Sequence, residues 1–153
     1  MTLSLYSALV LFVKKKDGSL HLCVDFCGFN CISKKDCYLL LLISNLLDSP
    51  WIYSKINLCH TYHLVHIANS NEWKTAFKTC YRSFEWSVMP FGLTNALAVF
   101  QWFINDIFSD LLDICVVIYL DDILIYSNNM SKYHQHVKEV LKCFCKASLY
   151  TKA

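Results

Sequence analysis

Apolar and polar positions alternate along the first part of the chain in a way that predicts short strands. Apolar runs at 8–13 and 20–26 flank the sequence Lys-Lys-Lys-Asp-Gly-Ser. Its Asp-Gly pair, ending at Gly18, is a strong β-hairpin signal, because glycine adopts positive φ without a steric penalty. Segment 39–47 fits either a buried helix or a buried strand, since its periodicity does not decide between them. Further short strands rich in aromatic and β-branched residues are predicted at 52–56, 63–67, 73–77 and 84–88.

From Thr94 onward the pattern changes to the spacing of an amphipathic helix. Thr94 fits the N-cap position, and one helical face carries Leu97, Phe100, Ile104, Ile107, Phe108 and Leu111. Two strongly apolar runs, 114–120 and 123–126, then flank Asp121 and Asp122, which predicts a buried hairpin with both carboxylates at its tip. A second helix is predicted from Ser131 to about Ser148. Strands and helices in this order indicate an α+β fold with helices packed on one face of a sheet.

The composition fits one globular domain and narrows the class of protein. The chain has 153 residues, of which 56% are hydrophobic and 17% charged, so extensive disorder and tandem domains are excluded. The nine cysteines lie within apolar runs rather than in a loop-rich scaffold, which indicates reduced thiols and an intracellular protein. The net charge of +2 leaves a nucleic-acid partner open, because the position of charge matters more than its sum.

Neither secretion nor a membrane partner is expected from the sequence. Residues 1–13 carry no charge, but no positively charged segment precedes them, which disfavours a signal peptide. The longest uncharged stretch, 86–105, is interrupted by Pro90, Gly92 and polar side chains, so it is poor material for a membrane helix.

Asp121 and Asp122 are the most informative residues of the chain. They lie between apolar runs, in the sequence Ile118-Tyr-Leu-Asp-Asp-Ile-Leu-Ile-Tyr126. Adjacent carboxylates held by core strands repel each other unless a cation lies beside them. Mg²⁺ suits such hard oxygen ligands, and it fills its remaining positions with water and phosphate oxygens. The alternative is a solvated turn, but the apolar strands on both sides favour a metal-binding hairpin.

Four ordered segments of the chain resemble one protein family. Tyr119-Leu-Asp-Asp122, followed by Ile123-Leu-Ile-Tyr-Ser127, resembles the catalytic hairpin of reverse transcriptases, specifically those of gypsy-type LTR retrotransposons. The other segments, in family order, are Val13-Lys-Lys-Lys-Asp-Gly-Ser-Leu20 with Val24-Asp-Phe26, Trp73-Lys-Thr-Ala-Phe77, and Phe84-Glu-Trp86 with Met89-Pro-Phe-Gly-Leu-Thr-Asn-Ala96 and Phe100-Gln101. Four motifs in the right order make the resemblance highly specific.

The resemblance implies a single reverse transcriptase domain fragment, 1–153, with a fingers-and-palm fold. The fingers would span about 7–50 and 63–90, and the palm about 51–62 and 91–153, as an antiparallel sheet with helices on one face. The family's thumb, connection and RNase H regions would be absent. The implied activity is RNA-directed DNA polymerisation on an RNA or DNA template with a primer and dNTPs, inside the cell, in a cytoplasmic particle or the nucleus.

In that family three carboxylates hold two Mg²⁺ ions, with Mn²⁺ as an alternative, for in-line nucleotidyl transfer. Asp121 and Asp122, with Tyr119 and Leu120 in the same hairpin motif, match two of these carboxylates. The first carboxylate of the family corresponds to Asn57, so this chain carries an amide there. The resemblance therefore implies an enzyme impaired by Asn57 and by truncation. The alternative is a non-catalytic nucleic-acid-binding remnant, or a functionless product of a degenerate element.

Five further positions resemble the family's nucleotide-binding residues. Lys15 would contact the triphosphate, and so would His21, which replaces an arginine and lacks its bidentate fork. Tyr62 matches the gate that excludes a 2′-hydroxyl, and Phe91 and Gly92 match the segment beneath the nucleotide. The alternative for Phe91 is an ordinary core residue.

The departures from the family pattern share one direction. Leucine replaces proline at Leu39, Leu41 and Leu97, and cysteine or histidine replaces arginine at His21, Cys27, Cys37, Cys59, His66 and Cys80. Each change, like Asp to Asn at position 57, requires a single C-to-T or G-to-A transition, which suggests a decaying element. A zinc site built from the cysteines and histidines is the other interpretation. No zinc is expected, because the chain contains no Cys-X2-Cys pair.

Overall fold

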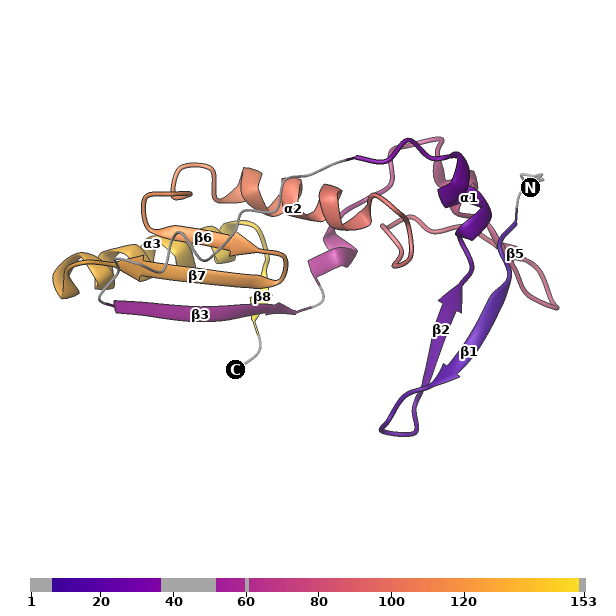
Figure 1. Cartoon of the computed structure of the whole chain (residues 1–153), viewed down its shortest axis with the longest axis horizontal. Coiled ribbons are helices and arrows are strands. Elements are labelled where there is room, and N and C mark those ends of the chain that lie inside the picture. Colours follow the sequence, from indigo (N-terminus) through magenta and orange to yellow (C-terminus); the bar gives the residue numbers. More distant parts are fainter. Residues whose placement is uncertain (1–6, 37–51, 60, 152–153) are drawn as a thin grey trace. The chain divides into compact units, whose positions relative to one another are not determined.

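A computed structural model of the chain separates into two units (Figure 1). The described residues are 7–36, 52–59 and 61–151. Unit 1 comprises Met1–Asp36 and Tyr62–Ala96, and unit 2 comprises Cys37–Thr61 and Leu97–Ala153. Each unit combines two segments that are distant in the sequence. The assignment of fingers and palm stays a prediction, and the predicted element at 39–47 lies outside the described residues.

A β-hairpin opens unit 1, as the Asp-Gly signal predicts. Strands β1 (Val10–Lys14) and β2 (Leu20–Val24) pair in antiparallel register. Gly18 has φ +83°, and its amide donates to the Lys15 carbonyl at 3.0 Å. The short helix α1 (Cys27–Ile32) follows the hairpin.

The strands predicted at 63–67 and 73–77 are wrong. The first segment begins inside the 3₁₀ helix η2 (Thr61–Leu64), and the second falls mainly in the 3₁₀ helix η3 (Glu72–Thr75). The Thr75 hydroxyl stabilises η3, because it donates to the Glu72 carbonyl at 2.7 Å. Strand propensity describes how well a side chain fits a half-buried pleated surface, so aromatic and β-branched residues also suit partly buried turns such as these.

Only short strands form in this part of unit 1. Strands β4 (Phe77–Lys78) and β5 (Ser83–Phe84) form a two-residue antiparallel ladder. The predicted strand 84–88 is therefore shorter than expected, and Val88 forms only an isolated bridge with His66.

Unit 2 contains a four-stranded sheet with the order β6-β7-β3-β8 (Figure 1). All its ladders are antiparallel. The strands are β3 (Ile52–Cys59), β6 (Val116–Tyr119), β7 (Asp122–Ser127) and β8 (Tyr150–Thr151). The β-branched runs on both sides of the carboxylate pair form the β6-β7 hairpin, as predicted.

Helices α2 (Ala96–Ile107) and α3 (Met130–Lys146) supply the core on one face of this sheet. The Phe108 ring, just after α2, packs edge-on against Phe144 of α3, with centroids 5.5 Å apart. Ile123 of β7 is fully buried, as are the inward residues of α2. On the other face, called the open face below, the described side chains of Lys55 and Asn57 are exposed and that of Asp122 is half-buried.

Both helices lie close to their predicted positions. Helix α2 begins at Ala96, so Thr94 is not its N-cap; the Thr94 amide instead donates to Asn30 Oδ1 at 2.9 Å. Asn129 caps α3, because its Oδ1 accepts the Ser131 amide at 2.9 Å. In the part of the chain that the structure describes, no helix has both the length and the apolar character needed to span a bilayer.

Candidate active site

Asp121 and Asp122 lie at the β6-β7 hairpin, but in different positions. Tyr119 pairs with Asp122 across the ladder, so the turn consists of Leu120 and Asp121. Asp122 is the first residue of β7, which corrects the prediction that both carboxylates lie at the tip. Antiparallel strands can be joined by only two residues, so the ladder extends as far as Asp122.

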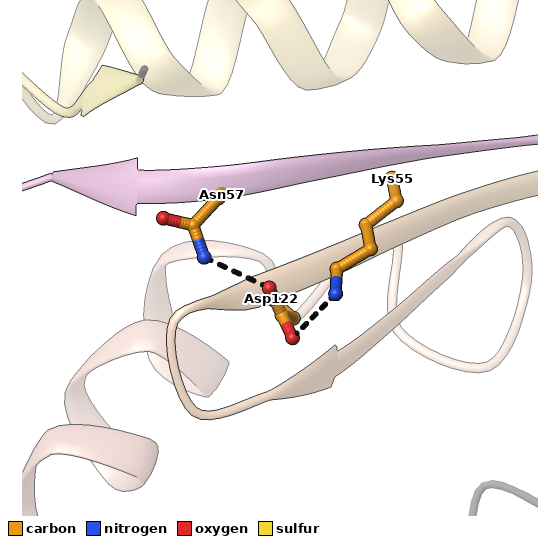
Figure 2. Close-up of polar contacts among 3 residues, drawn as sticks. All are labelled: Lys55, Asn57 and Asp122. Carbon is orange, nitrogen blue, oxygen red and sulfur yellow. Dashed lines mark hydrogen bonds and ion pairs between the residues drawn. The ribbon is translucent and has the colours of Figure 1, made fainter.

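Asp122 faces Lys55 and Asn57 on the open face of the sheet (Figure 2). Asn57 lies opposite Asp122 in the β3-β7 ladder, and its Nδ2 donates to Asp122 Oδ1 at 2.9 Å. Lys55 Nζ lies 2.8 Å from Asp122 Oδ2. Lys55 and Asn57 share this face because side chains alternate along a strand. Lys55 and Asn57 therefore contact one carboxylate oxygen of Asp122 each. The Lys55 side chain is 61% exposed and that of Asp122 is 37% exposed.

The pKa values of the two carboxyl groups shift in opposite directions. The Lys55 ammonium, and then the hydrogen bond from Asn57, hold the pKa of Asp122 below its ordinary value. Burial, and then the negative charge of Asp122, raise the pKa of Asp121. The Asp121 carbonyl accepts the Leu58 amide at 2.7 Å, which ties the turn to β3. The protein therefore compensates the charge of Asp122 well and that of Asp121 poorly, and a cation beside Asp121 would relieve this imbalance.

The ligand set of this site fits a divalent metal in part. Asp121 and Asp122 offer carboxylate oxygens, which are the ligands that Mg²⁺ prefers. Asn57 presents its amide nitrogen to Asp122, and its oxygen points away from that carboxylate (Figure 2). A third oxygen ligand would require this amide to turn over. Across 7–36, 52–59 and 61–151, no three His, Cys, Asp or Glu side chains gather into a group that could hold a metal ion.

Lys15 and His21 lie on the β1-β2 hairpin, and both are exposed. Lys15 stands at the start of the turn, where its amide donates to the Ser19 carbonyl at 2.8 Å. His21 lies in β2, opposite Val13. Both side chains are therefore accessible to a ligand from solution.

Tyr62 and Phe91 contact each other within unit 1. Their ring centroids are 4.6 Å apart, and the ring planes are inclined by 49°. Tyr62 is buried but Phe91 is 58% exposed, so the alternative of Phe91 as an ordinary core residue is wrong. Gly92 has φ +98°, and an added Cβ would lie at an ordinary contact distance of 3.6 Å from Phe26 Cδ2. Backbone conformation, rather than lack of space, requires glycine at this position.

Three polar side chains outside the predicted metal-binding and nucleotide-binding residues form hydrogen bonds that hold the neighbouring loops in place. Asn30 donates from Nδ2 to the Gly92 carbonyl at 2.8 Å, and Asn95 donates to a main-chain carbonyl just after α1 at 2.8 Å. Gln101 is 2% exposed and hydrogen-bonds to the β6-β7 turn. Gln101 had a sequence signal, as a polar residue in the apolar stripe three positions before Ile104. Asn95 lies within the quoted family segment 89–96, whereas Asn30 had no sequence signal.

Sequence comparison finds one matching protein family and a group of similar transposon polyproteins. The family model described as reverse transcriptase (RNA-dependent DNA polymerase) matches residues 13–153. The Tf2-3 transposon polyprotein of Schizosaccharomyces pombe is 41% identical over 143 residues, and the Tf2-7 polyprotein of the same yeast is 40% identical. Each alignment covers 92% of this chain but 11% of the polyprotein, so the chain spans about a tenth of the length of these relatives.

Solved structures share the fold at lower identity. The foamy viral protease-reverse transcriptase in complex with an RNA/DNA hybrid has a TM-score of 0.81 and 20% identity, over 97% of this chain and 20% of that chain. The same viral protein in complex with double-stranded DNA also has a TM-score of 0.81 and 20% identity, over 98% of this chain and 32% of that chain. These similarities confirm the predicted α+β fold with antiparallel sheets.

Proposed function

We propose that this chain, which belongs to the reverse transcriptase (RNA-dependent DNA polymerase) family, is the fingers-and-palm part of a gypsy-type retrotransposon polymerase. The 41% identity to a transposon polyprotein supports a retrotransposon origin. The Tyr119-Leu-Asp-Asp122 motif and the sequence that follows it support the gypsy type. In this proposal unit 1 supplies the fingers, unit 2 supplies most of the palm, and other parts of the full polyprotein are needed for its whole activity.

The observation that carries the proposal is the register between β3 and β7. Asn57 stands directly opposite Asp122, and Asp121 adjoins Asp122 in the turn. The three positions that carry carboxylates in the family motif therefore meet at one end of the open sheet face. A chance resemblance in the short hairpin motif alone would not require a third position to meet it from a strand 65 residues away in the sequence.

Asp121 and Asp122 are proposed to hold Mg²⁺, or Mn²⁺, through their carboxylate oxygens. When bound, the ions would supply charge stabilisation for in-line attack of a primer hydroxyl on a dNTP. Asn57 offers a neutral oxygen at most, so one full negative charge is missing from the site. Removing one preorganised electrostatic group typically costs about 10²- to 10³-fold in rate, and we expect at least this loss here.

Lys55 has to release one oxygen of Asp122 before that oxygen can bind a metal ion. The ion pair is 2.8 Å long, but the Lys55 side chain is 61% exposed. Exposed ion pairs typically contribute about 0–1 kcal/mol, so a divalent ion can displace the ammonium at small cost. Lys55 therefore acts as a replaceable counter-charge that keeps Asp122 ionised.

The proposed nucleotide-binding residues all lie in unit 1. Lys15 supplies an exposed point charge for the triphosphate, and His21 adds a weaker contact without a guanidinium fork. Tyr62 and Phe91 form a ring pair beside Gly92, which suits the support of a sugar and base. We propose that the partners are a primer on an RNA or DNA template and dNTPs, within the cell in a cytoplasmic particle or the nucleus.

Primer extension on poly(rA)/oligo(dT) tests the proposal. The full chain and its Asn57→Asp variant are assayed in Mg²⁺ and, separately, in Mn²⁺. We expect Asn57→Asp to raise the rate by roughly 10²-fold or more, because it restores the third carboxylate. Asn57→Asp combined with Asp121→Asn is the matched control, and it should remove the gain.

Each other outcome has a definite meaning. Equal and substantial extension by both chains would contradict the claim that Asn57 cripples the site. Binding of primer-template without extension by either chain would favour the non-catalytic remnant, and Asn57 is the observation that makes this second function worth testing. If the chain shows no binding and no extension, this result would contradict a role in template-directed synthesis.

A further inference from the structure

Gln101 is a buried polar residue that links helix α2 to the carboxylate-bearing hairpin. Its side chain is 2% exposed. Oε1 accepts the Leu120 amide at 2.8 Å, and Nε2 donates to the Ile118 carbonyl at 3.2 Å. Nε2 also donates to Asn105 Oδ1 at 3.0 Å, one helical turn along α2. Both donor hydrogens of the amide are thus used, and two of its three partners are main-chain groups of the hairpin.

The turn that Gln101 contacts has an unfavourable backbone conformation. Leu120 has φ +53°, in the left-handed region that residues with a Cβ rarely adopt. Glycine or asparagine is the usual choice at such a turn position, and neither is present here. A strained residue keeps this conformation only when its surroundings hold it there.

Two contacts hold the turn, one from α2 and one from β3. Gln101 binds the Leu120 amide from α2, and the Leu58 amide of β3 donates to the Asp121 carbonyl at 2.7 Å. The Leu58 contact continues the β3-β7 ladder by one residue. Gln101 is the buried side chain that reaches the strained residue itself, and the carboxylates of Asp121 and Asp122 follow within two positions.

We propose that Gln101 is a positioning residue, which holds Leu120 in its left-handed conformation and so fixes the directions of the Asp121 and Asp122 carboxylates. We call this contact between Gln101 and Leu120 the clamp. Its effect on catalysis rests on the proposed function, but the existence of the clamp does not. A misplacement of about 1 Å in a reactive group can cost about 100-fold in rate, so a loosened turn would impair the site although both carboxylates remain.

Amide hydrogen exchange by NMR, on the metal-free full chain, tests the clamp without requiring any activity. Gln101→Met keeps the side-chain length but removes the acceptor for the Leu120 amide. We expect exchange of the Leu120 amide, and of the Leu58 amide that donates to the Asp121 carbonyl, to rise by roughly tenfold or more relative to the core strands. Gln135→Met is the matched control, because Gln135 makes a similar hydrogen bond to Glu139 four residues along α3 but is exposed and has its partner on α3 rather than in the hairpin.

A second substitution separates positioning from general stability. Leu120→Gly removes the cost of positive φ, so it should restore most of the exchange protection of the Leu58 amide in the Gln101→Met background. If Gln101→Met alone does not fold, the double variant should still fold, because glycine needs no clamp. Failure of the double variant to fold would overturn the proposal.

Two more results would also overturn it. One is unchanged exchange at Leu120 in Gln101→Met. The other is a rise of equal size in β6 and β7 core amides, because Gln101 would then support only the fold as a whole. In the Asn57→Asp background, the clamp predicts a fall in kcat for primer extension with KM for dNTP unchanged. Absence of extension in Asn57→Asp itself concerns the proposed function and leaves the exchange result to decide the clamp.

Discussion

Asn57→Asp is expected to make the stability of this protein depend on a divalent metal ion. In the chain as it stands, Asn57 Nδ2 donates to Asp122 Oδ1 at 2.9 Å. The substitution removes this donor and places a second carboxylate against Asp122, with Asp121 next along the chain. Like charges at such a distance repel each other, and among the residues that the structure describes Lys55 is the cation paired with Asp122.

The magnitude follows from the distance and the exposure. Two unit charges about 4 Å apart repel by about 1 kcal/mol in water and about 4 kcal/mol at an effective dielectric constant of about 20. The Asp122 side chain is 37% exposed, which places the repulsion near the lower of these values. Adding about 1 kcal/mol for the lost hydrogen bond gives about 2 kcal/mol of destabilisation in metal-free buffer. In a chain of this size that corresponds to a fall in Tm of about 4–8 °C.

Metal binding should reverse most of this loss. At about 10 mM Mg²⁺ and a Kd of about 1 mM, binding to the folded state contributes about 1.4 kcal/mol. Thermal unfolding followed by circular dichroism, in EDTA and in Mg²⁺, measures both effects. Asn128→Asp is the matched control, since it adds the same charge at an exposed position about 20 Å along the chain from Asp122. The reasoning is refuted if Asn57→Asp in EDTA is as stable as the parent chain, or if Mg²⁺ stabilises both proteins equally.

Two further pairs of substitutions test the site and its loops. The pKa of Asp122 is lower in the folded than in the unfolded protein, so its carboxylate stabilises the fold above the unfolded pKa, and this stability is lost as the pH falls through the folded pKa. Asp122→Asn should therefore be less stable than the parent at pH 7 by a few tenths to about 1 kcal/mol, and equal to it in acid. Asp121 has a raised pKa, so it costs stability as the pH rises through that value; Asp121→Asn should therefore be the more stable protein at pH 7, with the difference vanishing in acid. Denaturant titrations across this pH range decide both signs, and equal pH profiles for the two variants would contradict the assignment. Gly92→Ala should destabilise by about 1–3 kcal/mol because of its positive φ, whereas Gly28→Ala inside α1, with open space at its Cβ, should stabilise by about 0.5–1 kcal/mol; the same sign for both would show that the backbone conformation is not the cause.

The sequence predicted the elements whose signal is local. The Asp-Gly turn at Gly18 and the carboxylate pair between two β-branched runs each identified a hairpin, because turn chemistry and neighbouring strands lie within a few residues. The strands predicted at 63–67 and 73–77 failed for the opposite reason. Their aromatic and β-branched residues suit burial in general, and the Thr75 hydroxyl selects a 3₁₀ turn through a contact that propensity does not contain.

The candidate site was predictable in its residues but not in its contacts. Asn57 could be placed in the site only through a family resemblance, since its partner Asp122 is 65 residues away and the register is set by a whole sheet. The Lys55 ion pair follows from the same register. Gln101 had a weak signal, because a polar residue interrupted an apolar helical stripe, but its target at Leu120 depends on how α2 packs on the hairpin.

If position 57 carries an aspartate in the family pattern, as proposed above, the amide in this chain is a departure from function that preserves the fold. An aspartate there would face Asp122 with a like charge, so a three-carboxylate site depends on bound metal for its own stability. Asn57 instead donates to Asp122, and with Lys55 it forms a compensated set that needs no metal. Natural proteins commonly exchange stability for function at such sites, and this substitution runs in the stabilising direction. Cys27 and Cys80, which the resemblance places at arginine positions of the family pattern, are exposed, so changes there would likewise leave the core intact. A chain drifting by C-to-T and G-to-A transitions would therefore lose its chemistry before its architecture. The silent third positions of the codons test this hypothesis, because changes there, relative to an intact copy of the element, that show no excess of C-to-T and G-to-A would refute it.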